Sequence, residues 1–116
     1  MTTTLDVVIK NQNELNCSYL PFIKDGGLFI PTSELFQLGD DVILNLQIPG
    51  YTESMKIEGK VVWITPGNSL YQTYHGIGIQ FTGENAKVTH DLIKSHIDTT
   101  QDVGGYAYGI VNASNL

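Results

Sequence analysis

The chain has 116 residues, of which 41% are hydrophobic and 16% are charged, a composition typical of one soluble globular domain. Twelve acidic residues outnumber six basic residues, all of them lysines, and the net charge is −6. Nucleic-acid binding draws on clustered basic groups, and no arginine is present, so this balance excludes nucleic acid as a partner.

Three features of the sequence predict a cytoplasmic protein. No apolar run approaches the roughly 18 residues that a membrane-spanning helix needs, so direct membrane insertion is not expected. The first residues, MTTTLD, have neither the basic nor the apolar region of a signal peptide. The single cysteine, Cys17, has no second cysteine with which to form an internal disulfide.

Apolar residues at every second position predict strands in the part of the chain that precedes the helix. Short runs of this kind, or of continuous apolar residues, are separated by glycine- and proline-containing turns, which favours an antiparallel barrel or sandwich over residues 4–82. The runs are Thr4–Lys10, Leu28–Ile30, Asp41–Ile48, Met55–Thr65 and Ile77–Phe81, with Leu15–Leu20 as a candidate for another.

The pattern changes to helical spacing in residues 84–98. This spacing predicts one amphipathic helix that packs on the barrel through Val88, Leu92, Ile93 and Ile97. Residues 101–116 have no clear period and are expected to form a flexible tail. Residues 1–100 are therefore expected to form a single domain.

No arrangement of residues predicts catalysis or a metal site. His90 and His96 lie six positions apart on the predicted helix and point in different directions, while His75 stands alone before a strand. Cys17 is expected to be a small buried hydrophobic residue rather than a nucleophile. The fragment Gly76-Ile77-Gly78 opens a strand, whereas a dinucleotide-binding motif opens a helix. We therefore expect a protein that is not an enzyme and has no cofactor and no small-molecule ligand.

A segment rich in aromatic residues and turns extends from Tyr19 to Thr32, and two interpretations of it stay open. A tight hairpin would bury its aromatic rings at one end of the barrel, or Tyr19 and Phe22 would stay exposed as anchors for a partner. Trp63 raises the same question. Alternation places it on the buried face of its strand, whereas a bulge at Gly59 would turn it to the other face.

Four blocks of the sequence closely resemble the short, stand-alone PilZ proteins of type IV pilus biogenesis. They are SYLPFIKDGGLFIPT at 18–32, LGDDV at 38–42, GKVVWITP at 59–66 and HGIGIQF at 75–81, and they occur in family order within a match over roughly residues 5–98. The resemblance implies a mostly β fold, a six-stranded antiparallel PilZ-type β-barrel followed by one C-terminal amphipathic helix.

Most PilZ domains bind cyclic di-GMP through an RxxxR element and a D/N-x-S-x-x-G element, and this sequence departs from both. The first element is impossible without arginine. The second aligns with residues 22–27, where Phe22 and Lys24 replace the polar residues and only Gly27 remains. The resemblance thus implies the branch of the family that does not bind cyclic di-GMP. The alternative is a PilZ-type sensor that binds it directly.

The resemblance also implies partners, namely the pilus extension ATPase and a GGDEF–EAL-type receptor protein for cyclic di-GMP. An adaptor between them would serve type IV pilus biogenesis and twitching motility in a bacterium. Aromatic and proline side chains at the former ligand rim would make that rim apolar, as in protein interfaces. The residues expected to form this partner-binding surface are Tyr19, Pro21, Phe22, Trp63 and Pro66.

Overall fold

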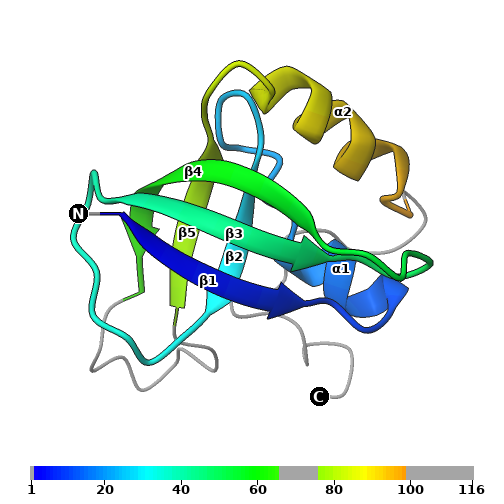
Figure 1. Ribbon diagram of the computed structural model, residues 1–116, viewed down its shortest axis with the longest axis horizontal. Helices are drawn as coiled ribbons and strands as arrows, with labels where there is room; N and C mark the ends of the chain where they lie inside the picture. Colours follow the sequence, from blue (N-terminus) through cyan, green and yellow to red (C-terminus); the bar gives the residue numbers. More distant parts are fainter. Residues whose placement is uncertain (1, 66–75, 99–116) are drawn as a thin grey trace.

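The protein is described by a computed structural model over residues 2–65 and 76–98, which form one curled sheet and two helices (Figure 1). The helices are α1 (Gln12–Ser18) and α2 (Ala86–Ser95). The strands are β1 (Thr3–Val8), β2 (Gly27–Pro31), β3 (Asp41–Gln47), β4 (Met55–Ile64) and β5 (Gly76–Phe81). Each of the five strong strand predictions is confirmed, with small shifts in its ends.

The strand order in the sheet is β1-β3-β4-β5-β2. β1 runs parallel to β3, and the other three neighbouring pairs are antiparallel. β1, β3 and β4 form one wall, and the sheet curls so that β5 and β2 lie behind it (Figure 1). The result is a half-barrel with β1 and β2 at its two edges.

The expected six-stranded antiparallel barrel with one helix is wrong in three respects for the described part of the chain. Five strands are present, one pair of them is parallel, and there are two helices. The candidate strand Leu15–Leu20 falls largely within α1, which connects the two edge strands. The fold nevertheless remains a mostly β, barrel-like sheet.

Helix α1 forms because its first turn is capped by local hydrogen bonds. The side chain of Asn11 accepts a hydrogen bond from the Glu14 N–H at 2.9 Å, and a Glu14 carboxylate oxygen accepts one from the Lys10 N–H at 2.7 Å. Capping of this kind stabilises a helix by about 0.5–2 kcal/mol. These bonds favour a helix where apolar spacing alone is ambiguous.

The core lies on the inner face of the sheet and under α2. β3 shows why: Val42, Leu44 and Leu46 are buried, and the residues between them are not. Side chains from every strand and both helices join this cluster, with Leu5 and Val7 of β1 packed against it while partly exposed. The other strands contribute mainly Leu28, Ile30, Ile57, Val61, Ile77, Ile79 and Phe81.

Helix α2 is shorter than the predicted 84–98, and its buried face differs from the predicted stripe. Ile93 is fully buried, but Val88 is 67% exposed. The inward position one turn before Ile93 belongs to His90, which packs against Phe81 with ring centroids 6.3 Å apart. The expected burial of Val88 is therefore wrong. The predicted tail, 101–116, lies outside the described residues.

Candidate partner-binding surface

The loop from Leu20 to Gly27 is a compact series of turns between α1 and β2. The Leu20 N–H donates to the Gly27 carbonyl at 3.0 Å, and the Gly26 N–H donates to the Ile23 carbonyl at 2.9 Å. Gln80 of β5 holds the loop from the side, because its amide donates to the Lys24 carbonyl at 2.8 Å. The loop is thus fixed to the sheet by its backbone, and its side chains need not hold it in place.

Tyr19 directly precedes this loop and is only 6% exposed, so the expectation of an exposed Tyr19 is wrong. Its hydroxyl is hydrogen-bonded to Nε2 of His90 at 2.8 Å, and the two rings stack with centroids 5.9 Å apart. Burial raises the pKa of the Tyr19 hydroxyl above its ordinary value. Tyr19 therefore attaches α2 to the barrel. No local sequence signal could have shown this pairing.

Pro21 and Phe22, in the same loop, are both exposed. Phe22 is 54% exposed, a large apolar surface for a side chain in a small domain, and Pro21 is also exposed. The interpretation of Phe22 as an exposed residue is confirmed. The structure thus separates two aromatic residues three positions apart, because Tyr19 is buried and Phe22 is exposed.

Trp63 is turned by a bulge in β4. The register between β4 and β5 shifts between Val61, which faces Ile79, and Trp63, which faces Gly78. Val62 is the additional residue, so the bulge lies there and not at Gly59. Since directly opposed residues share a face, Trp63 lies on the outer face with Gly78, while Val61 stays on the inner face with Ile79. Trp63 is half-buried.

Two glycines of β5 make room for a second, smaller apolar cluster on this outer face. A Cβ at Gly76 would meet the Phe29 ring at 2.9 Å, and a Cβ at Gly78 would meet the Cβ of Trp63 at 3.0 Å. The Phe29 and Trp63 rings lie 5.8 Å apart. The Gly76-Ile77-Gly78 fragment therefore has a packing role.

Leu20 connects the loop to this outer cluster. Its side chain is fully buried, and its Cδ1 lies 3.3 Å from where a Cβ of Gly78 would be, beside the Cβ of Trp63. Pro21 and Phe22 follow directly in the chain. The first residue of the loop therefore packs on the same face of the sheet as Trp63. Pro66, the fifth expected member of this surface, lies outside the described residues.

The remnant of the ligand motif has a structural explanation. Gly27 has no space for a side chain, because a Cβ there would collide with the Ile79 carbonyl oxygen. Gly26 has a positive φ of 85°, and its face is covered by the His90 ring. The Lys24 side chain is exposed. Gly27 is therefore required by the fold itself, with or without a ligand.

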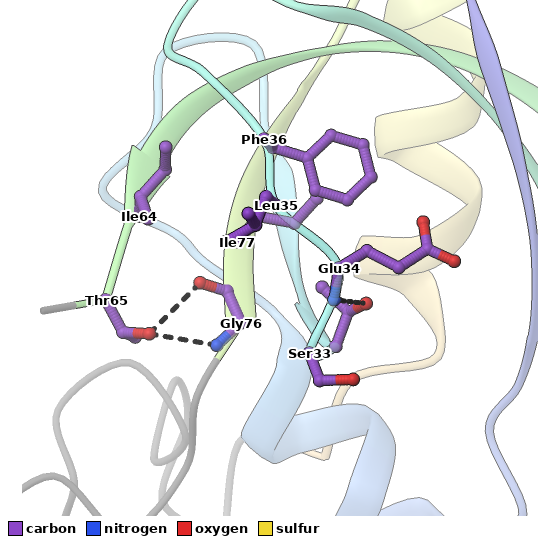
Figure 2. A pocket seen from close by; sticks show the side chains of 9 residues that line it. Ser33, Glu34, Leu35, Phe36, Ile64, Thr65, Gly76 and Ile77 are labelled. Carbon is purple, nitrogen blue, oxygen red and sulfur yellow. Dashed lines mark hydrogen bonds between the residues drawn. The ribbon is translucent and has the colours of Figure 1, made fainter. Parts of the chain in front are cut away.

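A cavity of about 540 Å³ opens at the end of β4 and the start of β5, and sequence reasoning missed it. Leu35, Phe36, Ile64 and Ile77 line it (Figure 2). The Thr65 hydroxyl closes one side by donating to the Gly76 carbonyl at 3.2 Å and accepting from the Gly76 N–H at 2.9 Å. The irregular loop before β3 has no periodicity that would reveal such a site.

The described residues show no arrangement for catalysis through a metal. Among residues 2–65 and 76–98, no group of three or more His, Cys, Asp or Glu side chains is placed to hold an ion. In the same ranges, neither helix is long and apolar enough to cross a membrane. Apolar contact surfaces, formed by Phe22, Trp63 and the rim of the cavity, are the distinguishing features.

Residues 1–98 match the PilZ domain family, which covers the whole described part of the chain. No curated protein matches the chain.

Proposed function

Because the chain belongs to the PilZ domain family, whose members are binding and adaptor domains related to cyclic di-GMP, we propose that it is a cytoplasmic adaptor for type IV pilus biogenesis and twitching motility. It has no catalytic activity of its own. In this role it contacts the pilus extension ATPase and a GGDEF–EAL-type receptor that carries the cyclic di-GMP signal. The chain itself does not bind cyclic di-GMP.

The absence of arginine supports the last point. Phosphates and guanine edges are gripped by planar, bidentate guanidinium groups, which lysine cannot replace. Each such charge-assisted hydrogen bond contributes about 1.5–3 kcal/mol, so losing several lowers affinity by orders of magnitude. At the remaining motif, an exposed phenylalanine, Phe22, stands where a carboxylate or amide would hold the ligand.

The observation that carries the proposal is the exposed Phe22 beside the exposed Pro21, directly after Leu20, which packs on the same face of the sheet as Trp63. Aromatic residues with a polar periphery are typical of interface centres, where a few anchors supply most of the binding energy. The loop backbone is fixed by Gly27 and Gln80, so a partner meets a preorganised surface. Tyr19 supports this surface from beneath.

Titration calorimetry with the purified extension ATPase and GGDEF–EAL protein of a piliated bacterium tests the proposal. Phe22→Glu should weaken partner binding at least tenfold while its melting temperature stays near wild type. Val88→Glu is the matched control, because it also places a carboxylate at an exposed apolar position, and it should bind normally.

Two results would contradict the proposal. One is a micromolar or tighter dissociation constant for cyclic di-GMP, which would make the chain a direct sensor. The other is a folded Phe22→Glu protein that binds both partners as tightly as the wild type does.

A further inference from the structure

The two edges of the half-barrel enclose a groove whose lining residues do not include Phe22 or Trp63. A cavity of about 480 Å³ lies between Thr4–Val8 of β1 and the end of β2 with the residues that follow it, Ile30–Thr32 and Glu34. Within the described ranges, β3 is the only strand that pairs with β1, so the other side of β1 faces this groove.

The backbone groups that face the groove follow from one hydrogen bond. The Ile9 N–H donates to the Gln47 carbonyl of the neighbouring wall at 2.8 Å, so the polar groups of Ile9 point toward β3. Successive residues of an extended chain point their N–H and C=O groups to alternate sides. Those of Thr4, Asp6 and Val8 therefore point into the groove.

The opposite wall offers fewer hydrogen bonds. The Gly27 carbonyl at the start of β2 already accepts a hydrogen bond from the Leu20 N–H, and Pro31 at the end of β2 has no N–H. An incoming strand would thus pair with β1 and pack against β2. In this geometry the groove resembles other sheet edges that bind an extended peptide as an added strand.

The side chains of the groove define the chemistry of such a peptide. Leu5 and Val7 are half-buried and point toward the core, so they present apolar surface to every second residue of an added strand. The charged residues that line the groove, Asp6 and Glu34, are both acidic, and both are exposed. Asp6 accepts a hydrogen bond from the Asn45 amide at 2.9 Å on the outer face.

We propose that this groove binds an extended segment of a partner protein in which apolar and basic residues alternate. The segment adds to β1 as a sixth strand, with its apolar side chains over Leu5 and Val7 and its basic side chains beside Asp6. Charge complementarity to the two carboxylates and to the net charge of −6 selects this occupant. The inference does not depend on the proposed pilus role or on Phe22.

The probe is a synthetic peptide of alternating lysine and valine, KVKVKVK, added to the full-length ¹⁵N-labelled chain. We expect amide chemical-shift changes centred on Thr4, Asp6 and Val8, and amide exchange at these residues slowed at least tenfold. A peptide with glutamate in place of lysine should bind at least tenfold more weakly. A peptide whose backbone nitrogens are methylated along one edge should also bind at least tenfold more weakly, because it lacks the N–H donors for pairing with β1.

A pair of variants tests the backbone contact from the side of the protein. Val8→Pro removes an N–H that faces the groove and should weaken binding about tenfold, whereas Val8→Ala keeps that N–H and should bind like wild type. If Val8→Pro does not fold, the N-methylated peptide decides the question with unaltered protein.

Three results would overturn the proposal. The first is equal binding of the N-methylated and unmodified peptides, and the second is shift changes remote from β1. The third is slow exchange at Thr4, Asp6 and Val8 before any peptide is added. If this protection does not depend on protein concentration, another segment of the same chain covers the β1 edge. If the protection increases with protein concentration, a second copy of the chain covers it.

Discussion

The hydroxyl of Tyr19 and Nε2 of His90 form a hydrogen bond of 2.8 Å that joins the end of α1, directly before the loop that leads into β2, to the middle of α2. His90 also covers Gly26 and contacts the ring of Phe81. One side chain of α2 thereby contacts the loop and the last strand of the sheet. Tyr19, directly before the loop that carries Phe22, and Gly26 within that loop thus both contact His90.

Loss of the Tyr19 hydroxyl should destabilise the domain without unfolding it. Tyr19→Phe keeps the ring stack and removes one hydrogen bond, so we expect a loss of about 0.5–1.5 kcal/mol in the free energy of unfolding. Tyr19→Glu should cost several kcal/mol, because it buries a carboxylate. Urea denaturation measures both. A stable Tyr19→Glu protein would contradict the burial of this residue.

Stability should fall in strongly alkaline solution partly because of Tyr19. Burial raises the pKa of its hydroxyl in the folded state above the ordinary value of 10.0. As the pH rises, the unfolded chain therefore loses this proton first. The contribution of the protonated hydroxyl to the free energy of unfolding is complete below pH 10.0 and is lost as pH rises through the folded-state pKa. The difference in unfolding free energy between wild type and Tyr19→Phe, followed from pH 8 to pH 11, should shrink over this window. A constant difference would contradict the prediction.

The two faces of α2 should respond very differently to truncation. Ile93→Ala removes a fully buried side chain and should cost about 2–5 kcal/mol. Val88→Ala alters a side chain that is 67% exposed and should change stability by less than about 0.5 kcal/mol. Thermal melts of the two variants check this order, and the reverse order would mean that α2 is rotated.

The glycine opposite Trp63 should be sensitive to a single methyl group. Gly78→Ala places a Cβ at 3.0 Å from the Cβ of Trp63, and overpacking of this kind costs about 1–3 kcal/mol. Trp63 is the only tryptophan, so its fluorescence emission should shift as the ring is displaced. Gly59→Ala is the control. It crowds Ile79 on the inner face and should destabilise the domain without the same shift in emission.

Sequence periodicity predicted the strands well where one face is buried and the other is not, as in β3. It left Trp63 undecided between the two faces, because the single extra residue at Val62 that reverses the alternation leaves no mark in the residue pattern. The capping residues Asn11 and Glu14 were visible in the sequence, and they would have identified α1 as a helix.

The candidate site was less predictable than the fold. The aromatic-rich segment and the altered ligand motif predict Phe22 as an exposed residue, and its exposure agrees with that interpretation. The burial of Tyr19 was not predicted, because it involves His90, which lies 71 positions away in the chain. The sequence argues against His90 as a metal ligand and assigns it no other role, because no local pattern relates a helical histidine to a distant loop.

The strand order has a consequence for how the chain folds as it is synthesised. β1 and β2 are made early, but β1 must wait for β3. Apart from an isolated bridge to Tyr19, the partner of β2 among the described residues is β5, the last of the five strands along the chain. Assembly of the sheet therefore starts in the middle, with the β3–β4 hairpin, and spreads to both edges. Until β5 emerges from the ribosome, the apolar residues of β2, Leu28 to Ile30, have no strand to pair with and are the segment most prone to aggregation.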